Sequence, residues 1–541
     1  MHQSGVTRRW RWLTLAGLGL AFAVVSPLLT SATGAGARAS SGPLAASGYI
    51  TSGPARIIAA HPARIATPAR PSGVQINRPA MPMAQYRAMK AAAAKAGGAK
   101  PSQPGSPLST NVIAGQAPLT VEGGPGGSWY PPDVNGAPGR SAPFSNQLTE
   151  ITNSKISVYS KSPSAPALLS EISLNTRFGY ATQPLFDPRI EYDARWNRWV
   201  AVADAFPETS GTQHFFLGIS STSDATGSWI IYNLVLPVGA GGFVDYPQLS
   251  LTQDAVVITY SDFATAGQSC LTLGIAKAAV YNAQGFSTFV FNLGGNCTVT
   301  PPNVIDPNPR AHELLWQAGI GAYNVEFRNP QGMLYSGING ISPVPVSSAA
   351  VPPNAPQPAA PACTAPSCNI DTLDGRFVND PTQYGDDLWA VHTPGFGTFP
   401  IPAWYDYDVE GAGANTAKQS GLQFFSGSSF DWNASIAAQS DGRAYMQWSY
   451  DDPGPGVYPS MAFTGRLATD PVNTMNATTS IFTGANKLMG NYDSNFGAQR
   501  WGDTSSIRFD PSVFVRAYAL NESVPNSAFW GTQQAAVAVT P

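Results

Sequence analysis

Charged residues are scarce in this chain, and histidine and cysteine are scarcer still. Asp, Glu, Lys and Arg together make up 12% of its 541 residues, with five His and four Cys. Such a low charge content excludes a coiled coil, a long helical bundle or a protein that coats nucleic acid. The usual motifs of serine esterases, zinc proteases, nucleotide hydrolases and dinucleotide-binding domains are also missing, so those activities lack their normal support.

Acidic residues are absent from the first part of the chain. All 33 Asp and Glu lie from Glu122 onward, whereas 12 of the 30 Lys and Arg precede that residue. The body of the chain is therefore acidic and follows a basic leader. This distribution argues against DNA, RNA or anionic lipid as a partner of the body, and it permits cations, neutral glycans or basic ligands.

The N-terminus has the pattern of an export signal. Arginines between positions 8 and 11 precede an apolar run from Leu13 to Leu29, which is followed by small residues up to Ala39. We expect residues 1–39 to be a signal peptide of bacterial type and the mature protein to be secreted and extracellular. An uncleaved membrane anchor is the alternative, but glycines and a proline inside the apolar run weaken it. We expect no membrane span in the mature chain.

Four cysteines lie in the exported body: Cys270, Cys297, Cys363 and Cys368. An even number of cysteines outside the cytosol predicts disulfides. Three pairings are possible, and proximity in sequence favours Cys270 with Cys297 and Cys363 with Cys368. Zinc is a poor alternative because the tight Cys-x-x-Cys spacing and nearby histidines are missing.

The composition and the residue pattern of the sequence change near residue 111. Residues 40–110 are rich in Ala, Pro, Ser and Arg and predict a disordered linker, apart from a short helix-favouring run near Met83 to Lys95. Beyond it, short runs rich in Val, Ile, Phe, Tyr and Trp alternate with turn residues and recur too closely for helical crossovers. The Pro-rich stretch 342–369 predicts a surface loop inserted between strands. The body, residues 111–541, is therefore expected to be all-β.

Four segments, beginning at Phe186, Val244, Phe430 and Trp501, repeat one pattern. In each, an Asp in a turn is followed by an alternating strand centred on Ile or Leu. A closed ring of four-stranded sheets is the architecture that hides the edges of so many short strands. We therefore predict a six- or seven-bladed β-propeller, with about 40 to 50 residues in each blade.

Eight ordered segments of the body also carry a family resemblance. They are Pro131–Gly136, Asp187–Asp193, Ser220–Trp229, Asp245–Pro247, Leu388–Thr393, Trp432–Ala437, Tyr458–Arg466 and Arg500–Ser506. These segments resemble a family of secreted bacterial β-propeller proteins, mostly of unassigned role, and more distantly the sialidase-like propellers. Residues 222–229 look like the Asp-box turn of sialidases with its Gly one place late. The arginine triad and Tyr/Glu pair that sialidases use have no clear equivalent, so the resemblance implies the fold and not that activity.

The candidate site consists of acids that lead the innermost strands, together with neighbouring aromatic and basic residues. Those strands open at one face beside the central channel, so the acids are expected to meet at one mouth. If the protein is an enzyme, the predicted catalytic residues are Asp133, Asp245 and Asp503. The predicted ligand-binding residues are Asp187, Arg189, Tyr246, Asp431, Trp432, Tyr458, Arg500 and Trp501.

Several kinds of chemistry fit such a site. Paired carboxylates can cleave a glycosidic bond, and aromatic rings beside carboxylates suit a sugar face and its hydroxyls. Converging oxygens could instead hold Ca²⁺, the one cofactor we consider. The structural alternative is that each Asp closes a turn, each aromatic packs between sheets and each Arg pairs with an acid.

The sequence favours a secreted propeller that recognises an extracellular ligand, with carbohydrate as the first choice, at the mouth of its channel. A glycoside hydrolase or polysaccharide lyase with paired Asp carboxylates is one alternative. An adhesion or scaffold protein that binds a protein partner through side loops such as 342–369 is the other. The sequence does not predict the oligomeric state.

Overall fold

A computed structural model describes most of the body and parts of the preceding segment. The described residues are 48–60, 79–101, 116–121, 130–162, 165–205, 212–265, 267–317, 321–328, 335–336, 343–344, 351–358, 367–409, 416–525 and 530–539. The signal peptide predicted at residues 1–39 lies outside them and stays a prediction. All the elements below belong to one unit, Ala39–Pro541.

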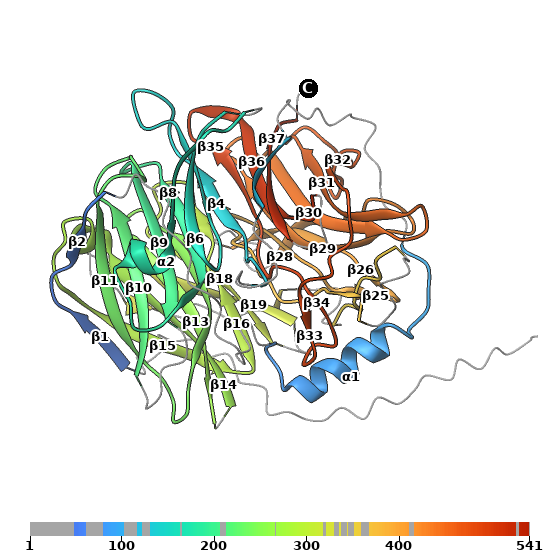
Figure 1. Ribbon diagram of the computed structural model, residues 1–541, viewed down its shortest axis with the longest axis horizontal. Helices are drawn as coiled ribbons and strands as arrows, with labels where there is room; N and C mark the ends of the chain where they lie inside the picture. The colour runs from blue at the N-terminus through green and yellow to red at the C-terminus, as the bar shows by residue number, and fades with distance from the viewer. Residues whose placement is uncertain are drawn as a thin grey trace, which may run out of the picture. The chain divides into compact units, whose positions relative to one another are not determined.

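The first three sheets follow one another along the chain and are called blades 1 to 3 (Figure 1). Blade 1 consists of β4 (Asn135–Pro138), β5 (Gln147–Ile151), β6 (Lys155–Ser160) and β7 (Leu168–Ser173). Blade 2 consists of β8 (Leu185–Asp193), β9 (Arg198–Ala205), β10 (Thr212–Ser220), β11 (Trp229–Pro237) and β2 (Arg56–Ile58). Blade 3 consists of β12 (Val244–Leu251), β13 (Ala255–Ala264), β14 (Gly267–Ala276), β15 (Phe286–Gly295) and β1 (Gly48–Ser52).

Four more sheets, blades 4 to 7, complete the series. Blade 4 consists of β16 (Cys297–Thr300), β18 (Ala311–Gln317) and β19 (Gly321–Arg328), on which β20 (Tyr335–Ser336) and β21 (Pro343–Val344) both pair. Blade 5 consists of β17 (Asn303–Val304), β23 (Thr382–Tyr384), β24 (Asp387–His392), β27 (Ala403–Asp408) and β28 (Thr416–Leu422). Blade 6 consists of β29 (Phe430–Ala438), β30 (Ala444–Asp452), β31 (Val457–Arg466) and β32 (Thr479–Gly484). Blade 7 consists of β35 (Ser506–Asp510), β36 (Val513–Ser523), β37 (Gly531–Val537) and β3 (Gln116–Val121).

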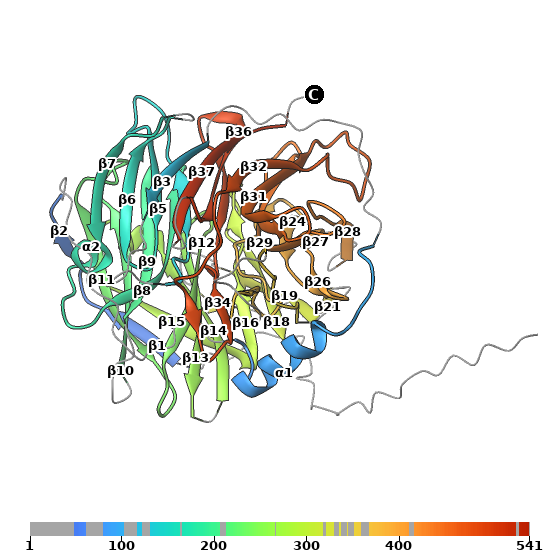
Figure 2. The same cartoon turned by 45° about the vertical axis from the view of Figure 1, so that its right-hand side comes forward.

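The blades form a closed ring. Strand β4 packs against β8, β8 against β12 and β12 against β17; further round, β23 packs against β29, β29 against β35, and β35 against β4. Strand β17 lies in the chain between β16 and β18 of blade 4 but pairs in parallel with β23, so it links blade 4 to blade 5. The last blade is completed by β3 from the other end of the chain, which pairs antiparallel with β37 (Figure 2). The predicted all-β propeller is confirmed, with seven blades in the described part.

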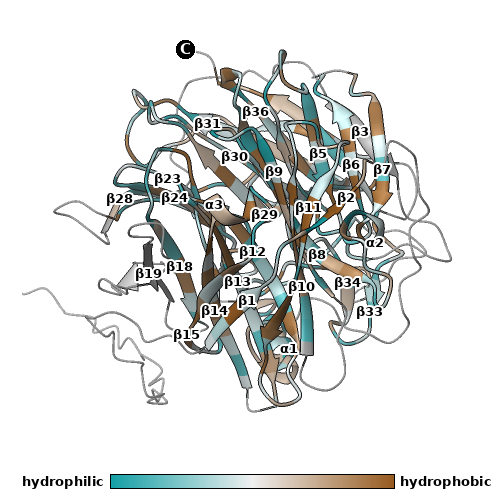
Figure 3. Ribbon diagram, turned by 90° about the vertical axis from the view of Figure 1, so that its left-hand side faces the viewer, coloured by the Kyte–Doolittle hydropathy of each residue, from teal (hydrophilic) through white to brown (hydrophobic). Residues whose placement is uncertain are grey.

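Apolar side chains between neighbouring blades hold the ring together. Leu217 and Ile219 of β10 share one buried cluster with Val256 and Ile258 of β13. Branched and aromatic residues fit such pleated, covered surfaces, which explains why these runs form strands. Figure 3 shows the hydrophobic residues (brown) interleaved with hydrophilic ones (teal) along the strands of blades 2 and 3. The innermost strands β8 and β12 are buried at every residue, so their polar groups need partners inside the protein.

A few short elements lie outside the blades. They are α1 (Met83–Ala93), α2 (Leu174–Phe178), α3 (Lys277–Val280), β22 (Ile370–Asp371), β25 (Gly395–Phe396), β26 (Phe399–Pro400), β33 (Tyr492–Asp493) and β34 (Ala498–Arg500). Helix α2 begins after Ser173, whose hydroxyl accepts a hydrogen bond from Thr176 N, and it ends at Gly179 in the left-handed conformation. Strands β22, β34 and β33 form a small separate sheet.

The prediction of a disordered linker over residues 40–110 needs correction. Strand β1 pairs with β15 and β2 with β11, so each adds a fifth, outermost strand to a blade. Helix α1 occupies the helix-favouring run noted near Met83 to Lys95. These segments are too poor in apolar residues to build a core of their own, but the open edges of existing sheets supply their hydrogen bonds.

The stretch from Pro79 to Pro101, which we call the arm, is anchored to the ring by buried polar contacts. The Tyr86 hydroxyl donates to Asp371 Oδ1 at 2.5 Å, and Lys90 Nζ lies 3.2 Å from the same oxygen. Lys100 Nζ lies 2.8 Å from Asp431 Oδ2. These contacts join the arm to β22 and to blade 6.

The predicted surface loop 342–369 also needs correction. Residues 351–358 are largely buried, and Ala355 exchanges two backbone hydrogen bonds with Ile370 at 2.7 and 2.9 Å. The Gln357 amide donates to the carbonyls of Cys368 and Leu488. Proline has no N–H to satisfy, so a Pro-rich segment can be buried with fewer hydrogen bonds than its length suggests.

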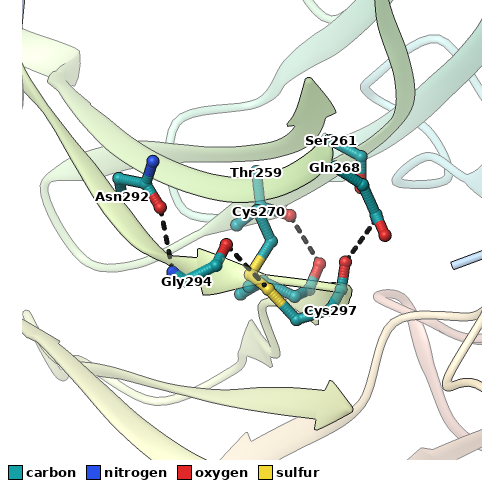
Figure 4. Close-up of a disulfide and its surroundings, with 8 residues drawn as sticks. Thr259, Ser261, Gln268, Cys270, Asn292, Gly294 and Cys297 are labelled. Atoms are coloured by element: carbon teal, nitrogen blue, oxygen red, sulfur yellow. Dashed lines mark hydrogen bonds between the residues drawn. A yellow bond between two sulfur atoms is a disulfide. The ribbon is translucent and has the colours of Figure 1, made fainter. Parts of the chain in front are cut away.

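The disulfide between Cys270 and Cys297 is present as predicted (Figure 4). Its Cα atoms are 5.6 Å apart, and it joins β14 of blade 3 to β16 of blade 4. The Gln268 amide donates to Cys297 O at 2.5 Å and to Ser261 Oγ at 3.0 Å, which holds the same junction. Cys363 lies outside the described residues, so the pairing of Cys363 with Cys368 stays a prediction.

Replacing both Cys270 and Cys297 by Ala should lower the free energy of unfolding by about 3 kcal/mol, because the cross-link restricts the unfolded chain. Denaturant unfolding of the double variant beside the oxidised parent measures the difference. A midpoint equal to that of the parent would show that the junction between blades 3 and 4 does not depend on the bond.

Candidate functional site

Four of the predicted aspartates meet at the end of the channel where the innermost strands begin, which we call the strand-start end. Asp133, Asp187, Asp245 and Asp503 come from blades 1, 2, 3 and 7, and each is at most 7% exposed. Asp133 Oδ1 accepts a hydrogen bond from Asp503 N at 2.5 Å, and the side chains of Asp187 and Asp245 share a hydrogen bond. The ring thus brings together residues that are up to 370 positions apart.

A β-bulge near the start of the innermost strand fixes this end of the channel in three blades. The register breaks after Phe186 in blade 2, after Asp245 in blade 3 and after Trp432 in blade 6. The next residue has a positive φ in each case: 45° at Asp187, 59° at Tyr246 and 50° at Asn433. These three residues are structurally equivalent, so the repeated Asp does not occupy the same position in each blade.

Because the position of the repeated Asp relative to the bulge differs between blades, Asp431 does not lie with the other four predicted acids. It precedes the bulge residue Asn433 by two positions, and its carboxylate is fully buried beside the arm. Asp431 accepts hydrogen bonds from Lys100 Nζ, Ser429 Oγ and Trp448 Nε1 at 2.7 to 2.9 Å. The expectation that Asp431 joins the other acids is corrected, and its carboxylate anchors the arm instead.

Burial governs the protonation of the acids at the strand-start end. Burial, and then the neighbouring carboxyls of Asp245 and Asp133, raise the pKa of Asp187 well above its usual range. Burial also raises the pKa of Asp503, although the Arg500 guanidinium opposes this shift. Two carboxyl groups can share a hydrogen bond only when one of them carries a proton, so the raised pKa and the geometry agree.

A cover of charged and aromatic residues closes this end. Arg376 pairs with Asp374 at 2.7 Å and lies 4.7 Å from the ring centre of Tyr246. Arg500 Nη2 lies 3.1 Å from Asp503 Oδ1, and Arg500 Nε lies 4.0 Å from Asp371 Oδ2. The roles of Asp371, Asp374 and Arg376 could not be predicted from the sequence, because these residues follow no repeated pattern.

The space left under this cover is too small for a sugar. The cavity beside Arg376, Trp432, Asn433 and Gly502 has a volume of about 10 Å³. That is about the space of a single water molecule, whereas small-molecule sites typically measure about 300 to 1,000 Å³. None of the four aspartates lines this cavity and all four are buried, so in this conformation they do not form an open ligand-binding mouth.

The other predicted residues have structural contacts. Arg189 donates to the carbonyl oxygens of Pro247 and Val378 at 3.0 and 3.1 Å, so it joins blades 2 and 3 to the segment that precedes β23. Trp432 and Trp501 pack edge to face with ring centres 5.5 Å apart. Tyr458 lies half-buried on β31 of blade 6. For the two tryptophans, packing between sheets accounts for the burial.

A pocket of about 380 Å³ lies at the opposite end of the innermost strands, the strand-end side. Five of the seven blades contribute to it. Its lining includes Pro138 of β4, Tyr192 of β8, Ile305 after β17, Thr382 of β23, Ala438 of β29 and Asp510 of β35. Because these elements surround the channel, the pocket lies on the channel axis.

One guanidinium holds two carboxylates in the floor of this pocket. Arg508 Nε donates to Glu191 Oε1 at 2.8 Å, and Arg508 Nη2 bonds both Glu191 Oε1 and Asp380 Oδ2. Asn303 Nδ2 lies 3.5 Å from Glu191 Oε2. All three charged residues are buried. Burial raises the pKa of Glu191 to about 7, with Arg508 opposing the shift and Asp380 adding to it.

A second ion group stands at the side of the pocket. Asp510 Oδ1 lies 2.8 Å from Lys161 Nζ, and Asp510 Oδ2 lies 2.7 Å from Arg516 Nη2. Aromatic residues complete the lining, since Phe509 is partly buried and Phe514 is 47% exposed. The pocket therefore combines fixed charges in its floor with an accessible ring at its edge.

This pocket was not predicted from the sequence, although two of its residues lie in the repeated segments. Glu191 lies four positions after Asp187, and Arg508 lies five after Asp503, near the end of each strand. An innermost strand has two ends on the channel, so a charged residue near its second end was a usable signal. Asp380 belongs to no repeat, and only the folded chain places it beside Arg508.

Two further structural findings bear on the sequence predictions. In the described ranges, no group of three or more His, Cys, Asp or Glu is arranged to hold a metal ion, and Ca²⁺ stays an untested expectation. No helix among those residues is long and apolar enough to span a bilayer.

The Glu191 carboxyl should make stability depend on pH. Its pKa is about 7 in the folded protein against 4.5 for the ordinary side chain, so the folded state binds this proton more tightly. The stability it contributes is complete below about pH 4.5 and is lost as the pH rises through about 7, by roughly 3 kcal/mol. Denaturant unfolding between pH 4.5 and 8 should show a smaller loss for Glu191→Gln than for the parent. Equal slopes would contradict the raised pKa.

Comparisons with known proteins give only distant structural likenesses. No protein-family model matches the chain, and no curated protein matches its sequence. Among solved structures, an exo-beta-1,3-galactanase from Phanerochaete chrysosporium is 9% identical with a TM-score of 0.33, covering 80% of this chain and 98% of its own. The WD40 domain of SCAP from fission yeast is 6% identical with a TM-score of 0.35, covering 78% and 98%. A subtype N10 neuraminidase-like protein of A/little yellow-shouldered bat/Guatemala/060/2010 is 10% identical with a TM-score of 0.35, covering 63% and 96%. Similarity at this level assigns no function, and the propeller rests on the strand order of the chain itself.

Proposed function

We propose that this protein is a secreted propeller that binds an extracellular carbohydrate in the strand-end pocket. One observation carries the proposal: a pocket of about 380 Å³ on the channel axis has a polar, charged floor and an aromatic edge. This volume falls within the usual range for small-molecule sites. The predicted mouth at the strand-start end, with about 10 Å³, does not.

The lining can contact both the hydroxyl groups and the apolar face of a sugar. Carboxylate oxygens of Glu191 and the amide of Asn303 can bond hydroxyl groups, and the Phe514 ring can stack on the apolar face of a pyranose. Arg443 lies over the Phe514 ring, 5.3 Å from its centre, and packs on one of its faces. Small apolar residues, including Ala137, Ala437 and Ala438, leave the space between floor and edge open.

Other hollows fit this role less well. One of about 340 Å³ lies between the arm and blade 3 and is lined mainly by Pro79, Met81, Pro82, Met83 and Phe263. It offers little polar surface for hydroxyl groups. Another, of about 510 Å³, is formed by β7, helix α2 and the loop that follows, and it lies away from the channel.

We also propose that the protein acts outside the cytoplasm. The Cys270–Cys297 disulfide supports it, because such bonds persist in oxidising compartments. Residues 351–358 of the side loop are largely buried, so they offer little surface to the protein partner of an adhesion role.

Recognition, rather than cleavage, is the proposed activity. The aspartates expected to form a catalytic pair are enclosed beside a cavity of about 10 Å³. In the strand-end pocket the carboxylates of Glu191 and Asp380 are both held by Arg508. Analysis of glycans for cleavage products after incubation with the protein will show whether any glycan is cut.

Replacing Phe514 by Ala should weaken glycan binding about three- to tenfold, the effect expected for losing one ring that stacks on a sugar. Calorimetric titration of the secreted body with a panel of soluble neutral polysaccharides measures this. Phe289→Ala is the matched control, since Phe289 is 45% exposed on β15 of blade 3 and does not line the pocket, so this variant should bind like the parent. Equal affinity of all three proteins, or no binding to any glycan, would count against the pocket.

A further inference from the structure

The charge pattern of the strand-end pocket bears on the kind of sugar that can enter it, an inference that rests on the proposed function. Its charged lining residues are two acids, Glu191 and Asp510, and one base, Arg508. Asp380 adds a third carboxylate directly behind the floor. Lys161 and Arg516, which pair with Asp510, balance these acids, so the pocket offers an anionic ligand no excess of positive charge.

The basic groups near the pocket are already committed to partners in the protein. Arg508 uses all three of its nitrogens, since Nη1 donates to Ile507 O at 3.0 Å while Nε and Nη2 hold the two carboxylates. Lys161 and Arg516 both pair with Asp510 and do not line the pocket. A carboxylate or sulfate group is bound best by a guanidinium that offers two parallel N–H groups, and this arrangement offers no such pair.

The floor instead presents hydrogen-bond acceptors that lack full partners. Asp380 Oδ1 is buried and has no hydrogen-bond partner among the described residues. Glu191 Oε2 has one long contact, 3.5 Å from Asn303 Nδ2. A buried acceptor without a full partner is costly, so Glu191, which lines the pocket, favours a ligand that brings O–H groups.

We infer that the pocket selects neutral, hydroxyl-rich sugar units and rejects sugars that carry carboxylate or sulfate groups. Hydroxyls can donate to the carboxyl oxygens held by Arg508, whereas an anionic substituent can only accept and finds no free N–H group of Arg508. The acidic body behind the basic leader gives the same preference at longer range.

Paired glycans test this selectivity on the parent protein. Calorimetry compares each neutral chain with an acidic counterpart: a β-1,4-galactan with polygalacturonate, and soluble cello-oligosaccharides with carboxymethylcellulose, both at low salt. Neutral members should bind at least tenfold more tightly. If acidic members bind as well or better, the inference is wrong while the proposed function stands. If neither kind binds, the proposed function itself fails.

Glu191→Gln tests the cause of the selectivity. The amide keeps the shape of the side chain, supplies an N–H donor and, at pH 8, removes the negative charge of the ionised carboxyl group, so at that pH the affinity ratio between neutral and acidic members should fall to less than threefold. Glu171→Gln is the matched control, because Glu171 lies on β7 outside the pocket and pairs with Lys155. Its ratio should equal that of the parent. An unchanged ratio in Glu191→Gln, with the circular dichroism spectrum of the parent, would overturn the assignment of selectivity to this carboxylate.

Discussion

Closure of the ring by β3 is the constraint on which the other features depend. The strand comes from residues 116–121, yet it pairs with β37 at the far end of the chain and completes blade 7. Each blade has two apolar faces that must be covered by neighbours, so an open arc would leave two faces exposed to water. Closure removes both, and it also makes every innermost strand a buried one. The polar residues on those strands then have to bond to one another across the channel.

The buried polar residues find their partners in different ways at the two ends of the channel. At the strand-start end, carboxyls share hydrogen bonds, Arg376 and Arg500 supply countercharge, and a small sheet and the arm lie over them. Almost no free volume remains there. At the strand-end side, Arg508 also neutralises a carboxylate, but the strands end in small residues and a pocket stays open. Buried charge alone therefore does not mark the functional end, and the free volume distinguishes the two.

The segment before the propeller is part of the same structure. Strands β1 and β2 extend blades 3 and 2, and the arm places Tyr86, Lys90 and Lys100 against buried acids. These three side chains supply most of the polar contacts between the arm and the ring. A segment that cannot fold by itself is thus ordered by the edges and charges that the ring presents to it.

The sequence by itself determined the fold class, the repeated pattern of acids before strands and the pairing of Cys270 with Cys297. These follow from local features: strand periodicity, turn residues and the proximity of two cysteines. It also indicated that Asp133, Asp187, Asp245 and Asp503 would meet, because equivalent strands must start on one side of a ring. It could not show that Asp431 falls two positions short of its bulge, since a bulge is set by pairing with the next strand.

Only the tertiary structure decided which end of the channel is open. The cover over the acids comes from residues 371–376 and 500 and from the arm, which follow no common sequence pattern and are assembled by contacts between distant segments. The pocket depends likewise on Asp380 meeting Glu191 and Arg508, which are 189 and 128 positions away along the chain. Free volume is a property of how side chains fill space in three dimensions, and local sequence patterns do not encode it.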